Sequence, residues 1–321
     1  MENGTFNTPC RTDMPLEKPH DKFFKETFSR PDILADFAQA CLPDSILQQI
    51  DFSTLVREVD SYIDAQLGEH FVDLLFSVQY ANRSIRLVLL LEHKSYIEEH
   101  PHFQLNQYLL NYWTSQLKAK QSLSPVLPII VYHGERNWVK KTVPDYFDAL
   151  NADLLPFIPS FDYILLNLGS HTEELLEKLK TDYARLTALL LQHSRKQQRL
   201  LKLFDDFADA FDRLAQEPVG RTFIETSFLY VYWSTNLTKE QVVTIFRKIS
   251  RRTGDIAMST AERLINEGIE KGIEQGMQLA TLRSIKSMLK LKMDAKTIAT
   301  ALDIPLPDVN DLIKKIEAGL A

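Results

Sequence analysis

The stretch FVDLLFSVQYANRSIRLVLLLEHKS, residues 71–95, decides the fold. Two apolar runs, 71–79 and 85–95, flank a short polar segment centred on Asn82-Arg83. Runs of this length and composition on either side of a tight turn predict two antiparallel strands joined as a hairpin. Counting outward from that turn places Asp73 directly opposite Glu92, on the same face of the sheet.

Asp73, Glu92 and Lys94 form the chemical centre that this pairing predicts. Lys94 follows Glu92 by two residues and therefore projects from the same face. Two carboxylates with Cβ atoms about 5 Å apart repel each other on an otherwise apolar strand pair. A hard divalent cation with oxygen ligands would offset that repulsion. We therefore expect Asp73, Glu92 and the backbone carbonyl of His93 to bind Mg²⁺, with Mn²⁺ or Ca²⁺ as alternatives.

The Lys94 ammonium has a chemical role at such a site. It would lie near a metal-bound water and a phosphate, where it could stabilise developing charge or position the water. The alternative is that Glu-His-Lys-Ser is a strand end emerging into solvent and that Asp73 caps its strand. His93 should point to the opposite face as a packed or hydrogen-bonded side chain.

The surrounding sequence predicts a layered α/β structure. A helix is expected from His20, with Pro31 opening its second part. Strands are expected at 55–66, 124–134 and 161–168, and a helix at 102–120. Helices and strands mixed in this order are typical of an α/β protein.

The chain changes character after Gly169 and becomes mainly helical from Thr172 to about Ile249. In the segment 260–278, glycines and large apolar residues each recur every four positions. Each interior glycine costs a helix about 1 kcal/mol relative to alanine. Close packing against another helix would explain them, and a dynamic linker is the alternative.

The last part of the chain, 284–316, has the pattern of a helix-turn-helix. Asp294 is placed to cap its second helix. The net charge of 281–321 is only about +2, so the pattern fits a packing or oligomerisation helix pair as well as a DNA-reading unit. We expect four segments: a disordered leader (1–18), a first domain (19–170), a helical subdomain (171–258) and this tail (259–321).

Composition limits the class of protein. The net charge of −6 argues against a protein that coats nucleic acid by bulk electrostatics. Cys10 and Cys41 are the two cysteines, so a disulfide framework or a cysteine metal site is excluded. The first nineteen residues lack the apolar core of a secretory signal, and no apolar run is long enough to span a bilayer. A cytoplasmic protein without a membrane partner is expected.

Several motifs in order resemble the Rpn family of recombination-promoting nucleases, which are also described as transposase-like. The motifs are HDKFFK (20–25), HFVDLLFSV (70–78), LLLEHKS (89–95), FQLNQYLLNYW (103–113), LPIIVYHG (127–134), FDYILLNL (161–168) and EGIEKGIEQG (267–276). The resemblance implies a restriction-endonuclease-like αβββαβ core of the PD-(D/E)XK type. It also implies metal-dependent DNA cleavage linked to recombination or mobile-element transfer.

The resemblance also assigns residues. Asp73 matches the core aspartate, and Glu92 with Lys94 matches the (D/E)XK pair. Asp21 matches the first-helix motif, where it either supports the site or caps its helix. Gln104 lies on the helix after the strand and is expected near the phosphate.

Gln107, on the same helix, is expected on a solvated face. His133 either approaches the site or only ends its strand. Three functions follow as hypotheses: an active Mg²⁺-dependent DNA endonuclease, a catalytically silent DNA-binding or assembly protein acting in transposition or defence, and a homo-oligomer that controls access to the site through its C-terminal helices.

Overall fold

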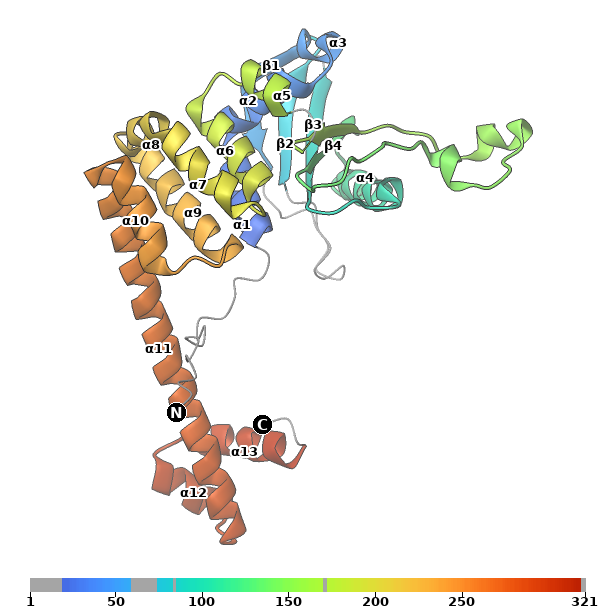
Figure 1. Ribbon diagram of the computed structural model, residues 1–321. Coiled ribbons are helices and arrows are strands. Elements are labelled where there is room, and N and C mark those ends of the chain that lie inside the picture. Colours follow the sequence, from blue (N-terminus) through green and yellow to red (C-terminus); the bar gives the residue numbers. More distant parts are fainter. Residues whose placement is uncertain (1–18, 59–73, 83–84, 170–171, 319–321) are drawn as a thin grey trace, which may run out of the picture. The chain divides into compact units, whose positions relative to one another are not determined.

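The computed structural model describes the chain except residues 1–18, 59–73, 83–84, 170–171 and 319–321. The chain divides into two compact units, one formed by residues 15–260 and the other containing residues 261–321. The larger unit has a mixed five-stranded sheet with helices on its two faces (Figure 1). The expectation of an α/β fold is confirmed at this level.

The sheet has the strand order β1-β2-β3-β4-β5. The first two pairings, β1 with β2 and β2 with β3, are antiparallel, and the other two are parallel. The strands are β1 (Ile50–Arg57), β2 (Leu74–Tyr80), β3 (Ile85–Lys94), β4 (Val126–Tyr132) and β5 (Ile164–Asn167). The central strand β3 is therefore buried on both faces, which explains its nearly continuous apolar run.

The β2–β3 hairpin has the predicted register. Leu74 pairs with Leu91 and Tyr80 with Ile85. Ala81 and Asn82 are the first two of the four residues between the paired strand ends, and their φ angles of 51° and 54° are left-handed values, which are uncommon for residues other than glycine and mark a tight turn. The register prediction is confirmed for the described residues, and its next pair would join Asp73 to Glu92. Asp73 itself lies outside the described residues.

The predicted strand at 55–66 was placed too late in the sequence. β1 begins at Ile50 and overlaps the prediction only at residues 55–57, and the rest of the predicted segment lies largely outside the described residues. The first half of β1 contains the polar residues Asp51, Ser53 and Thr54, which obscure the apolar pattern expected of a strand. A register shift between Asp51 and Val56 interrupts the alternation of side chains that usually identifies a strand.

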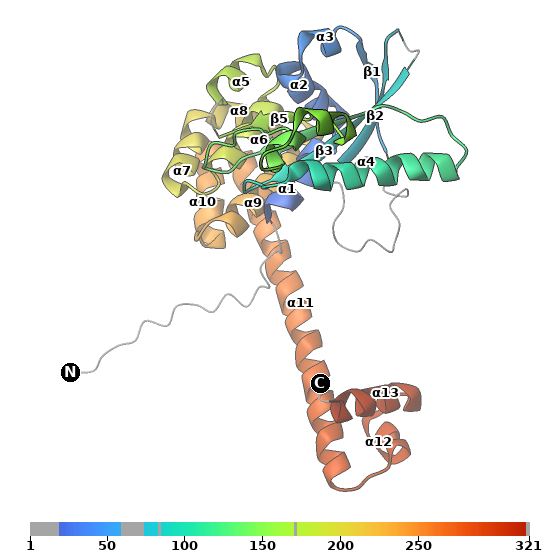
Figure 2. The ribbon, with the colours of Figure 1, turned by 90° about the vertical axis from the view of Figure 1, so that its right-hand side faces the viewer.

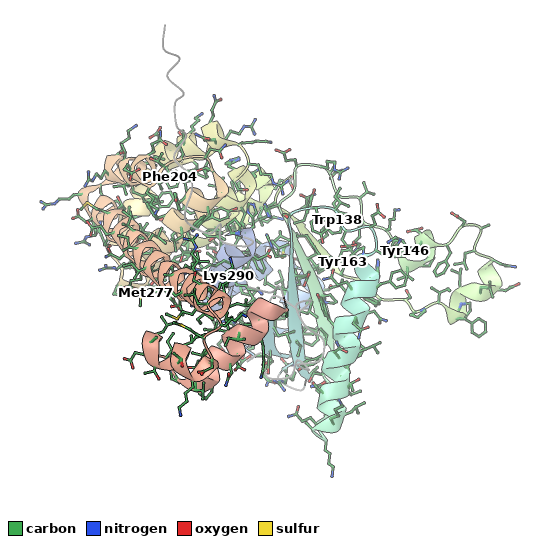
Figure 3. All side chains as sticks on the ribbon, turned by 90° about the horizontal axis from the view of Figure 1, so that it is seen from below. Trp138, Tyr146, Tyr163, Phe204, Met277 and Lys290 are labelled. Atoms are coloured by element: carbon green, nitrogen blue, oxygen red, sulfur yellow. The ribbon has the colours of Figure 1, made fainter. Side chains whose placement is uncertain are left out.

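Helix α4 (Pro101–Lys118) covers one face of the sheet (Figure 2). Its apolar residues Leu105, Tyr108 and Tyr112 pack against alternate residues of three strands. The same cluster includes Trp138 and Tyr163, which are labelled in Figure 3. This packing places the first turn of α4 beside the end of β3.

The other face of the sheet packs against α1 (Pro19–Phe28) and α2 (Pro31–Cys41). The helix break at Pro31 is confirmed, with the proline in the first turn of α2. The ring of Phe24 stacks on His93, and the ring of Phe23 stacks on Tyr230 with centroids 4.2 Å apart. Helix α1 therefore lies between the sheet and α9.

The helical part of the larger unit agrees with the predicted change of character. It contains α5 (Thr172–Lys178), α6 (Asp182–His193), α7 (Gln197–Asp206), α8 (Ala208–Ala215), α9 (Pro218–Ser234) and α10 (Lys239–Ile249). Three short elements lie earlier in the chain: α3 (Asp44–Leu47) before β1, and the 3-10 helices η2 (Val143–Tyr146) and η3 (Ala152–Phe157) between β4 and β5. The buried carboxylate of Asp36 on α2 accepts hydrogen bonds from the backbone N–H groups of Lys180 and Thr181 and from the Thr181 hydroxyl. These bonds fix the start of α6 against the first helices.

The second unit is built around the C-terminal part of α11 (Arg251–Lys290), with α12 (Ala295–Leu302) and α13 (Leu306–Glu317). Asp294 caps α12 through the Thr297 N–H, as predicted. Ile285, Ile298 and Val309 form its small core. Within the part of the chain that the structure describes, no helix has the length and apolar character needed to cross a membrane.

Candidate active site at the end of strand β3

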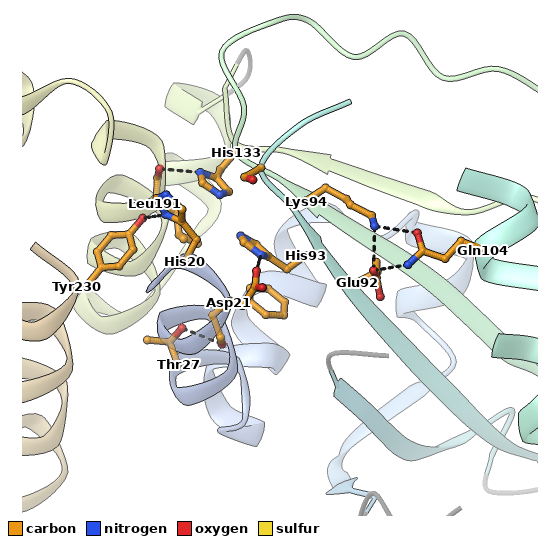
Figure 4. Close-up of polar contacts among 12 residues, drawn as sticks. His20, Asp21, Thr27, Glu92, His93, Lys94, Gln104, His133, Leu191 and Tyr230 are labelled. Carbon is orange, nitrogen blue, oxygen red and sulfur yellow. Dashed lines mark hydrogen bonds and ion pairs between the residues drawn. The ribbon is translucent and has the colours of Figure 1, made fainter. Parts of the chain in front are cut away.

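Glu92, Lys94 and Gln104 form a closed polar cluster on the α4 face of the sheet (Figure 4). The Lys94 ammonium lies 3.1 Å from Glu92 Oε1 and donates to Gln104 Oε1 at 2.8 Å. The Gln104 amide in turn donates to Glu92 Oε1 at 2.8 Å. Only one orientation of the amide satisfies both neighbours, because the ammonium can only donate and the carboxylate can only accept.

Burial makes this cluster unusual. The side chains of Glu92 and Lys94 are each only 7% exposed. Charged groups removed from water are tolerated when they are paired and hydrogen-bonded, as these are. Tyr108 accepts a hydrogen bond from the Gln104 amide at 2.6 Å. The exposed ring of Tyr96 lies 5.6 Å from the Lys94 ammonium, so the buried charge is close to the surface.

His93 points to the opposite face, as predicted. Its Nδ1 lies 2.8 Å from an Asp21 carboxylate oxygen. A carboxylate only accepts hydrogen bonds, so Nδ1 of His93 carries the proton. The imidazole ring lies between Phe24 and His133, with centroid distances of 4.9 and 4.8 Å. The first turn of α1 is thereby attached to the strand that presents Glu92 and Lys94.

His20 and His133 extend this second cluster toward the helical part of the unit. His133 donates its Nδ1–H to the Leu191 carbonyl at 3.1 Å, and His20 Nδ1 lies 2.8 Å from the Tyr230 hydroxyl. Burial, followed by repulsion from His93, lowers the pKa of His20 to about 4 and that of His133 to about 2. Both rings are therefore neutral at neutral pH.

The structure brings some of the predicted site residues together and separates others. Glu92, Lys94 and Gln104 are in direct contact. Asp21 is placed on the other face of β3, where its carboxylate contacts the His93 ring. Asp73 lies outside the described residues, as stated above.

Sequence reasoning missed the partners of this second cluster. Nothing local in the sequence links His20 to Tyr230, which are 210 positions apart. His133, expected either to approach the site or only to end its strand, stacks on His93 rather than lying beside Lys94. In the parallel pairing of β3 with β4, His93 pairs with Val131. His133 follows Val131 by two residues, so the alternation of side chains places both histidines on the same face.

The donor set present is a partial match to the expected Mg²⁺ site. Among the described residues, no group of three or more His, Cys, Asp or Glu side chains is arranged to hold a metal ion. Glu92 supplies a hard carboxylate donor of the kind Mg²⁺ prefers, and Mg²⁺ typically uses only one or two protein carboxylates with several waters. The residues therefore fit such an ion, provided that Asp73 contributes as the register predicts.

The fold and the buried cluster define a mixed α/β protein with a candidate catalytic site at the end of its central strand. The chain belongs to the family described as putative transposase, YhgA-like, whose model matches residues 18–220. It is 25% identical to the inactive recombination-promoting nuclease-like protein RpnE of Escherichia coli K12, covering 92% of this chain and 99% of that protein.

Two further relatives come from the same strain. Recombination-promoting nuclease RpnC is also 25% identical, covering 95% of this chain and all of RpnC. Recombination-promoting nuclease RpnA is 33% identical over 36% of this chain and 40% of RpnA. No solved structure matches the chain significantly.

Proposed function

We propose that this protein is a divalent-metal-dependent DNA endonuclease of the PD-(D/E)XK type, acting in DNA recombination or mobile-element transfer. The buried Glu92–Lys94–Gln104 cluster is the observation that carries the proposal. Burying an ammonium and a carboxylate is costly, and hydrophobic residues would serve a purely structural strand end better. The hairpin register supports Asp73 as the second acid.

Glu92, Asp73 and the His93 carbonyl would hold the ion, which when bound lowers the pKa of a water and neutralises phosphate charge. Lys94 supplies a fixed positive charge that can donate to a phosphate oxygen and stabilise charge as it develops there. Gln104 holds the ammonium in place, because its amide contacts both charged groups. The relatives named as nucleases support this assignment. We also propose that the protein acts in the cytoplasm.

The decisive experiment is nicking of supercoiled plasmid by the full chain with Mg²⁺, Mn²⁺ or EDTA. Glu92→Gln, Lys94→Met and Asp73→Asn should each reduce metal-dependent nicking at least ~100-fold, since each removes a group assigned to the transition state. Glu99→Gln and Lys118→Met make matched changes at exposed positions and should retain activity. Circular dichroism checks that every variant is folded.

A catalytically silent DNA-binding or assembly protein is the second candidate. One observation favours it: RpnE, which matches over nearly the whole chain, is named as inactive. Absence of cleavage with any of these ions, or equal cleavage by wild type and all three site variants, would replace the nuclease proposal with this one. Retention of DNA in a mobility-shift assay would then identify binding, and the salt dependence of its affinity would count the phosphate contacts.

A further inference from the structure

The segment that joins α6 to α7, together with the first turns of α7, carries a run of basic side chains. No aspartate or glutamate occurs between Tyr183 and Phe204, whereas the chain as a whole has a net charge of −6. Four exposed cations of this segment form a group that we call the basic strip: Arg195, Lys196, Arg199 and Lys202. A local excess of positive charge on an acidic chain creates a surface potential that attracts anions.

The charges of the basic strip are not neutralised by the part of the chain that the structure describes. Among the described residues, none of its four side chains pairs with a carboxylate. Arg195 donates to the Ser95 carbonyl at 3.1 Å, a neutral acceptor that leaves the charge of the guanidinium in place. Burial, followed by repulsion from Arg199 and Lys196, lowers the pKa of His193. The positive charge of the strip is therefore available to an outside partner.

The packing of α7 keeps the strip on the surface. Leu203 and Phe204 are buried, and the ring of Phe204, labelled in Figure 3, has its centroid 5.1 Å from that of Phe246 on α10. A helix that buries one face in this way presents its charged residues on the other. Arg199 and Lys202, which are three residues apart, are neighbours on that exposed side of α7.

The basic strip begins beside the candidate active site. The Arg195 guanidinium contacts the carbonyl of Ser95, which is the residue that follows Lys94. Because Lys94 is the last residue of β3, the strip and the cluster of Glu92, Lys94 and Gln104 adjoin the same end of the central strand. A long polyanion lying across this end of β3 could contact both. Duplex DNA, with one negative charge per about 1.7 Å of its helix axis, is such a molecule.

We propose that the basic strip is a docking surface for the sugar–phosphate backbone of duplex DNA, which it holds across the end of β3 while a phosphodiester lies at Glu92 and Lys94. Lysine and arginine contacts to phosphates fix the position and orientation of a duplex but carry no sequence information. The strip should therefore bind duplexes of different sequence equally well. The choice of DNA as the partner rests on the proposed function, but docking does not require cleavage.

Binding of a fluorescently labelled duplex to the full chain, measured by anisotropy in EDTA, tests the docking surface without cleavage. Lys196→Gln combined with Lys202→Gln should weaken binding about tenfold and lower the slope of log Kd against log salt by about 1.8, since each phosphate contact contributes about 0.9. Lys118→Gln combined with Lys120→Gln removes the same charge from exposed positions at the end of α4 and should change neither. Wild-type affinity in the strip variant, or an equal loss in the control variant, overturns the proposal.

Nicking kinetics separate docking from the proposed cleavage. With Mg²⁺, the strip variant should raise KM for plasmid about tenfold and retain kcat, whereas Lys94→Met should lower kcat. If the wild type binds the duplex in EDTA but nicks with no ion, the cleavage proposal fails, while weaker binding by the strip variant still supports docking. A wild-type chain without affinity for the duplex overturns docking. Displacement of the duplex by poly-glutamate as readily as by unlabelled DNA, at equal total charge, replaces DNA with an acidic polypeptide as the partner.

Discussion

The carboxylate of Asp21 lies 2.8 Å from Nδ1 of His93, on the face of β3 opposite to Glu92 and Lys94. This bond joins the first turn of α1 to the strand that presents the candidate site. Because side chains alternate along a strand, fixing the ring of His93 also fixes the directions of the residues on either side. We therefore expect Asp21 to position Glu92 and Lys94 from the opposite face of the strand.

Replacing Asp21 tests this relationship. Asp21→Ala should lower the free energy of unfolding by about 1–2 kcal/mol, since it removes a charge-assisted hydrogen bond to a buried ring. Nicking should fall as well, while Asp21→Asn, which keeps an acceptor, should retain more of both. Urea unfolding and plasmid nicking measure the two effects. Loss of stability together with wild-type nicking would show that the bond serves the fold alone.

Gln104 offers a separate test of the site. Gln104→Ala removes the amide that contacts both Glu92 and Lys94, and we expect ~10–100-fold slower nicking with a loss of about 1–3 kcal/mol in stability. Gln107→Ala, three residues further along the same helix and exposed, should change neither. Equal behaviour of the two variants would contradict the assigned role of Gln104.

Acid should destabilise the protein through His20 and His133. Their folded pKa values, about 4 and about 2, lie below the unfolded value of 6.5. The unfolded chain therefore binds more protons, so the stabilisation is fully present above pH 6.5 and is lost as pH falls toward the folded pKa values. Two protons correspond to a slope of up to about 2.7 kcal/mol per pH unit. Urea unfolding between pH 7.5 and 5 measures it.

A histidine variant tests whether His133 contributes to this pH dependence of the unfolding free energy. His133→Gln removes one titrating ring, and its stability should depend on pH about half as steeply as that of the wild type between pH 6.5 and 5. His100→Gln, at an exposed position, should keep the full slope. Stability that does not change between pH 7.5 and 5 in the wild type would contradict the buried neutral state of both rings.

Asp36 should be among the most sensitive positions for stability. Asp36→Ala leaves the N–H groups of Lys180 and Thr181 and the Thr181 hydroxyl without their buried acceptor. We expect a loss of about 2–4 kcal/mol in unfolding free energy. Asp44→Ala, an exposed acid near the same helices, should cost well under 1 kcal/mol. Comparable losses in the two variants would show that the hydrogen bonds to the Asp36 carboxylate do not stabilise the fold.

Two glycines should respond to alanine in opposite directions. A Cβ atom at Gly220 would collide with the backbone carbonyl of Leu214, where α9 approaches α8. Gly220→Ala should therefore destabilise the larger unit by about 1–3 kcal/mol or more. Gly272→Ala has open space around it and should raise the helicity of α11 in dilute, monomeric protein. Thermal melts followed by circular dichroism measure both changes.

The parts of the fold that local patterns control could be predicted. The hairpin register follows from the length of the turn and from the alternation of the strands, and it is found between Leu74 and Tyr80. The break at Pro31 and the cap at Asp294 follow from backbone chemistry that depends on a few neighbouring residues. The cluster of Glu92, Lys94 and Gln104 follows from the same register and from the helix that comes after β3.

The parts that depend on distant packing could not be predicted. From the sequence, Asp21 is equally compatible with capping its helix and with supporting the site. Only the packing of α1 against the sheet determines which face its carboxylate contacts. The start of β1 at Ile50 was hidden by a register shift that breaks the alternation. His20 and Tyr230 are in contact although they are 210 positions apart in the sequence, and no short-range pattern predicts such a contact.

The position of α1 between the sheet and α9 has a consequence for biosynthesis. Phe23 stacks on Tyr230, which the ribosome adds about 10–40 s after α1 at ~5–20 residues per second. Throughout that interval the apolar side chains of α1 that pack against α9 in the folded protein remain uncovered in the nascent chain. The N-terminal half should therefore depend on chaperones during translation, and chains cut short before α9 should aggregate or be degraded.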